Sequence, residues 1–245
     1  MIQQDLPLRT YIDDRYRTRD YVRDLYAGAS GLVMRASHRL MERGIAPAQN
    51  IDVLEIGGGG MPHLGWMDAT QLRRFTVSDR MALHGTTMAK LEAEWGGRAE
   101  ILRHDFDADP DMASLPGGYS RIVASHVLEH VAEPERALLR WTALLAPGGV
   151  MSLALPCDPG WMWRLGQVLG YRRAALGIDF AEYDLVMSRE HVIPVQRVLK
   201  LARYYSGHVG LRWFPARVPV VDFNLVCAIT LAREDWRGPE GLLVR

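Results

Sequence analysis

The chain has few of the features that mark several common protein classes. Its 245 residues include only two cysteines, Cys157 and Cys227, without ligand residues at metal-binding spacing, which argues against a disulfide scaffold or a structural zinc site. The 29 basic residues balance 29 acidic ones, which argues against a nucleic-acid binder that neutralises phosphates. No apolar run approaches the roughly 20 residues of a membrane span, and the N-terminus lacks the apolar core of a secretion signal. We therefore expect a cytoplasmic protein with no integral membrane segment and no nucleic-acid partner.

What the chain does have, from residue 51 onward, is an alternation of short apolar segments with helix-like segments. Buried strands that alternate with helices are typical of βαβ units, so we predict one doubly wound α/β domain. The predicted strands are 51–56, 75–79, 99–105, 120–126, 150–156, 208–214 and 222–232. The predicted helices are 64–73, 83–95, 133–145 and 192–205.

Two segments depart from this alternation. Residues 9–43 show apolar positions at helical spacing and predict two helices broken near Gly28–Gly31, so that 1–48 form an N-terminal helical cap on a domain that spans 49–245. Residues 157–190 follow the fifth strand. Long insertions at that edge of a sheet commonly form a lid or a substrate wall, and we predict this role here. Its aromatic residues suit either a carbohydrate face or core packing: Trp161, Trp163 and Tyr183.

Acidic residues follow a pattern at the predicted strand ends. The sequence LEIGGGGMPHLG, residues 54–65, places Glu55 before four glycines, which allow a sharp turn and a close approach of a ligand to backbone N–H groups. Asp79 ends the next strand and suits a ribose diol, and Asp105 with Phe106 ends the third and suits an adenine. No phosphate-loop Lys-Ser/Thr follows the glycines. Three acidic strand ends on one sheet edge predict a nucleotide-containing ligand there.

Two further motifs extend this pattern. They are SHVLEHVAEP at 125–134 and LAPGGVMSLALP at 145–156. With the glycine loop and the strand-end acids, they make residues 51–156 resemble class I S-adenosylmethionine-dependent methyltransferases, in particular the group with an HVLEH motif. The resemblance implies S-adenosylmethionine as cofactor and a Rossmann-like sheet of seven mostly parallel strands with an antiparallel last strand. The later segment, from SREHVIP to VVDFNLV, is similar to methyltransferases of bacterial surface-polysaccharide gene sets, which makes a sugar hydroxyl the leading acceptor.

The resemblance also implies a set of cofactor contacts, all near the strand ends. It assigns the amino-acid end of the cofactor to Glu55, Gly57 and Gly59, the ribose and one side of the adenine to Asp79 and Arg80, the adenine to Asp105 and Phe106, and the border of the methyl sulfonium to Ser125 and His126. Gly58 departs from the larger residue often found between the first glycines. Backbone contacts should survive this difference.

Histidines are the candidate catalytic residues. Methyl transfer to a hydroxyl requires a group that accepts its proton, and His126 and His191 can do so because a neutral imidazole is available near pH 7. Purely structural roles stay open for both. Some quinone-pathway O-methyltransferases bind a divalent metal at the matching motif, so His126, Glu129 and His130 are alternative metal ligands. We favour helix-start packing for Glu129 and His130 and predict no metal requirement.

The sequence therefore predicts methyl transfer to the oxygen of a sugar, a glycan or a small natural product. One alternative is N-methylation of a lipid head group or amine, with helices in 9–43 touching a membrane. Another is a non-catalytic, methyltransferase-like partner subunit, against which the intact acids at three strand ends argue. A homodimer is left open.

Overall fold

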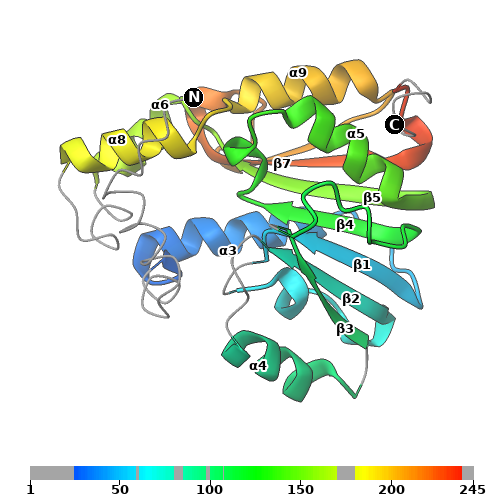
Figure 1. The fold of residues 1–245 in the computed structure, drawn as a ribbon. Helices are drawn as coiled ribbons and strands as arrows, with labels where there is room; N and C mark the ends of the chain where they lie inside the picture. Colours follow the sequence, from blue (N-terminus) through cyan, green and yellow to red (C-terminus); the bar gives the residue numbers. More distant parts are fainter. Residues whose placement is uncertain are drawn as a thin grey trace.

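The computed structural model describes residues 25–58, 61–79, 85–97, 100–106, 108–169 and 180–238. Within them, a seven-stranded sheet has the order β3-β2-β1-β4-β5-β7-β6 (Figure 1). Strand β7 is antiparallel to β5 and β6, while the other pairs are parallel, which confirms the predicted doubly wound sheet with an antiparallel last strand. The strands are β1 (Ile51–Ile56), β2 (Leu72–Asp79), β3 (Glu100–Asp105), β4 (Tyr119–Ser125), β5 (Leu145–Pro156), β6 (Gly210–Pro215) and β7 (Asn224–Ala232).

Six α-helices accompany the sheet in the described part of the chain. Two of them begin next to proline, a residue whose fixed φ suits a helix start: Pro134 opens α5 and Pro194 caps α9. The helices are α3 (Gly28–Glu42), α4 (Gly85–Trp95), α5 (Pro134–Leu144), α6 (Trp161–Val168), α8 (Phe180–Glu190) and α9 (Val195–Tyr205). Residues 9–24, where the first helix of the cap is predicted, lie outside the described residues.

The predicted helix over 64–73 is wrong. Two single turns of 3-10 helix, η1 (His63–Trp66) and η2 (Ala69–Gln71), occupy the segment, and β2 already begins at Leu72. Asp68 accepts hydrogen bonds from the backbone N–H and the hydroxyl of Thr70. Such local bonds offer the backbone an alternative to a continuous helix, and Leu72 pairs with Ile51 of β1 instead.

Helices cover both faces of the sheet, as the alternation of side chains along β5 shows. Met151, Leu153 and Leu155 belong to the core that includes α5 and α9. Ala154 belongs instead to a cluster with α3, because successive residues of a strand point to opposite faces. In Figure 1, α5 and α9 accordingly lie together on one side of the sheet and α3 on the other.

The segment after β5 holds two of these helices. Both α6 and α8 fall within the insertion predicted at 157–190, although 170–179 lie outside the described residues. Figure 1 shows them close together beyond the carboxyl end of β5. None of the helices described is long and apolar enough to cross a membrane.

Candidate active site

The carboxyl ends of the parallel strands bring the predicted cofactor residues to one edge. Asp79 and Asp105 are direct neighbours in the β2–β3 register. Glu55 lies one strand away, level with Val77 on β2, and Ser125 ends β4 opposite Ala154. Ligands of open α/β sheets bind at this edge, so the sheet gathers these four side chains where the sequence predicts a ligand.

Glu55 is buried and binds the backbone just after the glycine segment. Both of its carboxylate oxygens lie 2.8 Å from the backbone nitrogen of His63, which donates to them. Burial, partly offset by this hydrogen bond, raises the pKa of Glu55 to about 8, and the nearby Asp79 adds to the rise. Glu55 therefore anchors the backbone that follows the glycines, a role that the sequence prediction does not include.

The glycine turn itself is described as far as Gly58. Gly57 has a φ of +73°, which suits glycine because L side chains rarely adopt that region, and its N–H donates to Ser78. A Cβ at Gly58 would lie 2.5 Å from the Val77 side chain. The departure at Gly58 thus has a local cause: a larger residue would collide with β2. Gly59 and Arg80 lie outside the described residues.

The next two strand ends fit an adenosine-containing ligand. Asp105 is exposed and Asp79 half-buried, so both carboxylates are within reach of a bound molecule. Phe106, half-buried beside them, donates its N–H to the Asp79 carbonyl. At the end of β4, the Ser125 hydroxyl is buried and has no hydrogen-bond partner among the described residues. An adenosine group needs acceptors for its ribose diol and an aromatic face for its adenine. This edge offers both, beside an unsatisfied hydroxyl that a ligand could pair.

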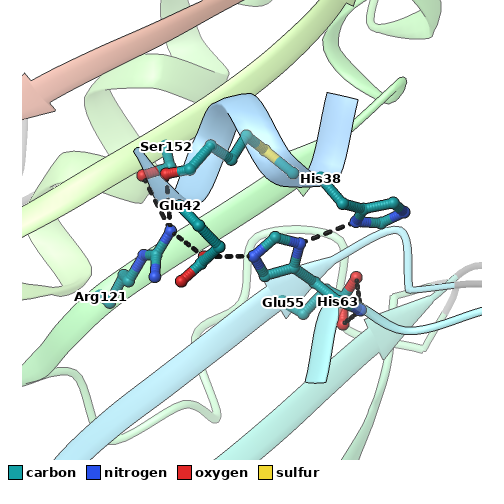
Figure 2. A network of polar contacts seen from close by, with 7 residues as sticks. His38, Glu42, Glu55, His63, Arg121 and Ser152 are labelled. Atoms are coloured by element: carbon teal, nitrogen blue, oxygen red, sulfur yellow. Dashed lines mark hydrogen bonds and ion pairs between the residues drawn. The ribbon is translucent and has the colours of Figure 1, made fainter. Parts of the chain in front are cut away.

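A buried polar network fastens α3 to this edge (Figure 2). His38 of α3 lies 2.7 Å from His63, nitrogen to nitrogen, and the other ring nitrogen of His63 lies 2.6 Å from the Glu42 carboxylate. The same Glu42 oxygen lies 2.6 Å from the guanidinium of Arg121 on β4, which also donates to the backbone carbonyl of Met41. The helix is thus tied both to β4 and to the residue that Glu55 anchors.

Electrostatics in this network favour neutral histidines beside an ion pair. Burial, with the nearby charges of His63 and His126, lowers the pKa of His38 to about 2. Burial also lowers the pKa of His63, although Glu42 opposes it. Burial alone would raise the pKa of Glu42, but the hydrogen bonds from His63 and Arg121 lower it. We infer one continuous chain of donors, from the Tyr26 hydroxyl through His38 and His63 to the Glu42 carboxylate.

His126 is held in an uncommon conformation at the end of β4. Its φ is +56°, a region that few residues other than glycine adopt and that is enriched at functional sites. Its Nε2 lies 2.9 Å from the Ser37 hydroxyl of α3, and its Nδ1 lies 3.5 Å from the Glu129 carboxylate. The predicted catalytic residue therefore lies between the strand end and the N-terminal helix.

Glu129 is buried in η3 (Leu128–His130) among imidazoles. Burial alone would raise its pKa, but contact with His126 and the nearby charges of His130 and His191 lower it to about 2. Neither carboxylate oxygen has a hydrogen-bond partner among the described residues. The group is therefore a carboxylate anion that lies in the interior of the protein.

His191, the second predicted catalytic residue, lies beside this anion. It follows α8, and its Nδ1 lies 2.8 Å from the carboxylate of Asp158. Its ring stacks on Trp163, with centroids 5.9 Å apart, and meets His130 edge to face at 5.2 Å. The sequence prediction missed Asp158, which carries no motif and becomes significant only when the insertion folds back on it.

A cavity of about 300 Å³ opens next to His126. Its walls are mostly apolar, with Leu32 and Val33 from α3 and Met162 and Leu165 from α6. Residues of α8, β6 and β7 complete it. The volume is at the lower end of the range for small-molecule sites. The insertion and the N-terminal helix thus enclose a small apolar space at the end of β4.

The aromatic residues of the insertion divide between surface and interior. Trp161 is 74% exposed, whereas Trp163 and Tyr183 are buried and line the cavity. Both cysteines are buried as well, and burial raises the pKa of the Cys157 thiol to about 12. Neither thiol is therefore a reactive group near neutral pH.

Comparison with known proteins gives one family. Residues 21–208 match the model of a family described as a methyltransferase domain. A search of the curated proteins finds no match to the sequence.

Solved structures share the fold at low sequence identity. The N-methyltransferase NodS from Bradyrhizobium japonicum WM9, solved with S-adenosyl-L-homocysteine, is 16% identical with a TM-score of 0.60, over 92% of this chain and 97% of that one. The CurJ carbon methyltransferase is 16% identical with a TM-score of 0.56, over 85% of this chain and 56% of that one. An O-methyltransferase family protein from Burkholderia thailandensis is 18% identical with a TM-score of 0.53, over 82% of this chain and 56% of that one. The chain thus spans little more than half the length of the last two.

Proposed function

The chain belongs to the methyltransferase domain family, and we propose that it methylates a hydroxyl oxygen on a small, largely apolar acceptor. It is an S-adenosylmethionine-dependent methyltransferase with the class I fold. The observation that carries the proposal is the position of His126, which directly follows β4 and lines the apolar cavity.

Cofactor binding falls to the side chains at the strand ends. Asp79 and Asp105, adjacent in register, would accept hydrogen bonds from the ribose and the adenine amino group, and Phe106 would cover the ring. Glu55 would act at the amino-acid end through the backbone it anchors, because its own carboxylate is enclosed. Ser125 would use its unsatisfied hydroxyl at the border of the reacting methyl group.

The cavity supports the choice of acceptor. A bare sugar carries hydroxyls around its whole ring, and burying them against apolar walls without partners is costly. A natural product with an apolar body and one hydroxyl would lose little on entering between Leu32, Val33 and Met162. Of the two acceptor classes that the sequence predicts, the small natural product therefore fits the cavity better.

His126 is the proposed general base. S-adenosylmethionine supplies an electrophilic methyl group, so the chain must hold the acceptor in line and take its proton. His126 reaches the cavity from the end of β4, and Glu129 beside its Nδ1 would stabilise the imidazolium that forms. His191 does not line the cavity and is held by Asp158, which makes it the second candidate for the base.

Methyl transfer with defined acceptors tests this function. The full chain would be incubated with methyl-labelled S-adenosylmethionine and matched apolar phenols, apolar alcohols, amines and sugars. We expect label on the hydroxyls with apolar bodies and a rate that rises with pH. His126→Gln should lower the turnover rate by ~10²–10⁴-fold, the usual contribution of a general base, while cofactor affinity stays nearly unchanged. His208→Gln, at an exposed histidine, is the matched control.

Two results would contradict the proposal. A loss of less than about threefold in both His126→Gln and His191→Gln, far below the contribution of a base, would exclude proton removal by histidine. Label found on the amines alone would favour the alternative of N-methylation. The similar structures include carbon-, nitrogen- and oxygen-directed proteins, so the fold leaves the acceptor atom open and this assay decides it.

A further inference from the structure

Three side chains from two distant segments converge beside the proposed active site. Glu129 and His130 lie in the turn after β4, and His191 follows α8. One ligand atom from each, a carboxylate oxygen and two ring nitrogens, lies within 4.8 Å of the others. Two imidazoles and a carboxylate form a donor set that zinc and ferrous iron bind in proteins.

Both imidazoles are oriented as metal ligands are. His191 donates its Nδ1 proton to the Asp158 carboxylate at 2.8 Å, and His130 donates its Nδ1 proton to the backbone carbonyl of Glu190 at 2.8 Å. A carbonyl or a carboxylate can only accept, so these bonds place the lone pair of each neutral ring on Nε2. Metal-binding histidines characteristically make such a bond through the other ring nitrogen.

Glu129 and His191 offer buried, unsatisfied atoms at this cluster. Both Glu129 oxygens and the Nε2 of His191 are buried and have no hydrogen-bond partner among the described residues. The Nε2 of His130 lies 4.0 Å from the Glu129 carboxylate. Glu129 is a buried carboxylate, and a divalent cation between these atoms would give its unsatisfied oxygens a partner.

We propose that Glu129, His130 and His191 bind one divalent transition-metal ion. Metal–ligand distances of about 2.0–2.2 Å place two ligands at most roughly 4 Å apart, so the side chains need to close by less than about 1 Å. His130 is half-buried, so the ion could enter from solvent on its side of the cluster. The set differs from the one considered from the sequence alone, because His191 takes the place of His126.

Metal binding by the full chain tests the site without any methyl transfer. Protein stripped by a chelator would be titrated with Zn²⁺ in a calorimeter and with Co²⁺ followed by visible absorption. We expect one ion per chain and Co²⁺ bands of a four- or five-coordinate site. His191→Gln and Glu129→Gln should weaken binding beyond the roughly 10–100-fold that loss of an outer-shell partner produces, whereas Asp158→Asn should fall within that range.

The controls separate this site from adventitious binding and from loss of folding. His208→Gln, at an exposed histidine, should bind the ion with unchanged affinity. His130→Gln removes a half-buried ligand that folding tolerates more readily, and it should also weaken binding. Absence of stoichiometric binding, or binding that His130→Gln and His191→Gln both leave unchanged, would overturn the proposal. Either result leaves the proposed methyl transfer by His126 standing, because the readout does not depend on activity.

Discussion

The ion pair between Glu42 and Arg121 should be a principal support of α3 on the sheet, and Glu42→Gln tests it. Arg121 is buried, with a side chain 4% exposed. Its Nη2 also contacts the Met41 carbonyl and the Ser152 hydroxyl, while its Nε has no partner among the described residues. Glu42 is the one carboxylate paired with this guanidinium in the described part of the chain. Glutamine keeps the shape but removes the charge.

The expected loss of stability comes from the Arg121 charge, which stays buried without its partner. Breaking a buried ion pair by removing one partner costs about 3–5 kcal/mol, because an uncompensated charge stays buried. Glu42 is 27% exposed, so solvent already screens part of the pair and the lower end applies, about 3 kcal/mol. For a chain of this size, each kcal/mol lowers Tm by about 2–4 °C. Glu42→Gln should therefore lower Tm by about 6–12 °C.

Urea unfolding and thermal melting of the full chain measure this loss. The matched control is Glu100→Gln, which removes a carboxylate from the exposed pair with Arg74 and should cost at most about 1 kcal/mol. Adding Arg121→Met to Glu42→Gln removes the unpaired charge and should restore much of the stability, since buried pairs can be replaced by apolar residues. A loss no larger than that of Glu100→Gln, or no recovery in the double variant, would refute the assignment.

Two further predictions concern the ligand edge and the buried histidines. Asp79→Ala should weaken S-adenosylmethionine binding by about 1–3 kcal/mol in calorimetry, and normal affinity in both Asp79→Ala and Asp105→Ala would exclude the strand-end assignment. His38 alone should lower the free energy of unfolding by about 1 kcal/mol as the pH falls from 7 to 5.5. In the unfolded chain its imidazole takes up a proton with a pKa of about 6.5, whereas in the folded chain it stays neutral. Glu55 acts in the opposite sense, since its raised pKa contributes stability at low pH that is lost as the pH rises through about 8. His38→Phe should remove only the His38 contribution, so the change in unfolding free energy from pH 7 to pH 5.5 should differ between variant and parent by about 1 kcal/mol. An identical pH dependence in the two proteins would contradict the neutral state of His38.

Much of the ligand edge could be predicted because it follows from chain order alone. Parallel strands present their carboxyl ends at one edge, so acids that end successive strands must meet. Asp79 and Asp105 do so in direct register. The same logic fails for Glu55, whose position was predicted but whose partner was not. Its hydrogen bonds go to the backbone of His63, and a backbone nitrogen leaves no pattern in a sequence.

The residues that set the acceptor side were harder to predict, because their partners are distant in the chain. Ser37 of α3 belongs to a helix that appears from the sequence as an ordinary amphipathic helix, yet its buried hydroxyl meets His126. His191 can be singled out from the sequence, but its neighbours cannot, because they depend on the return of the segment after α8 to the turn after β4. Periodicity identifies which face of a helix is apolar but not which strand end that face will cover. A glycine loop and strand-end acids can therefore predict the cofactor from a sequence. The acceptor depends on how α3 and the segment after β5 pack over His126, and only the folded chain determines that packing.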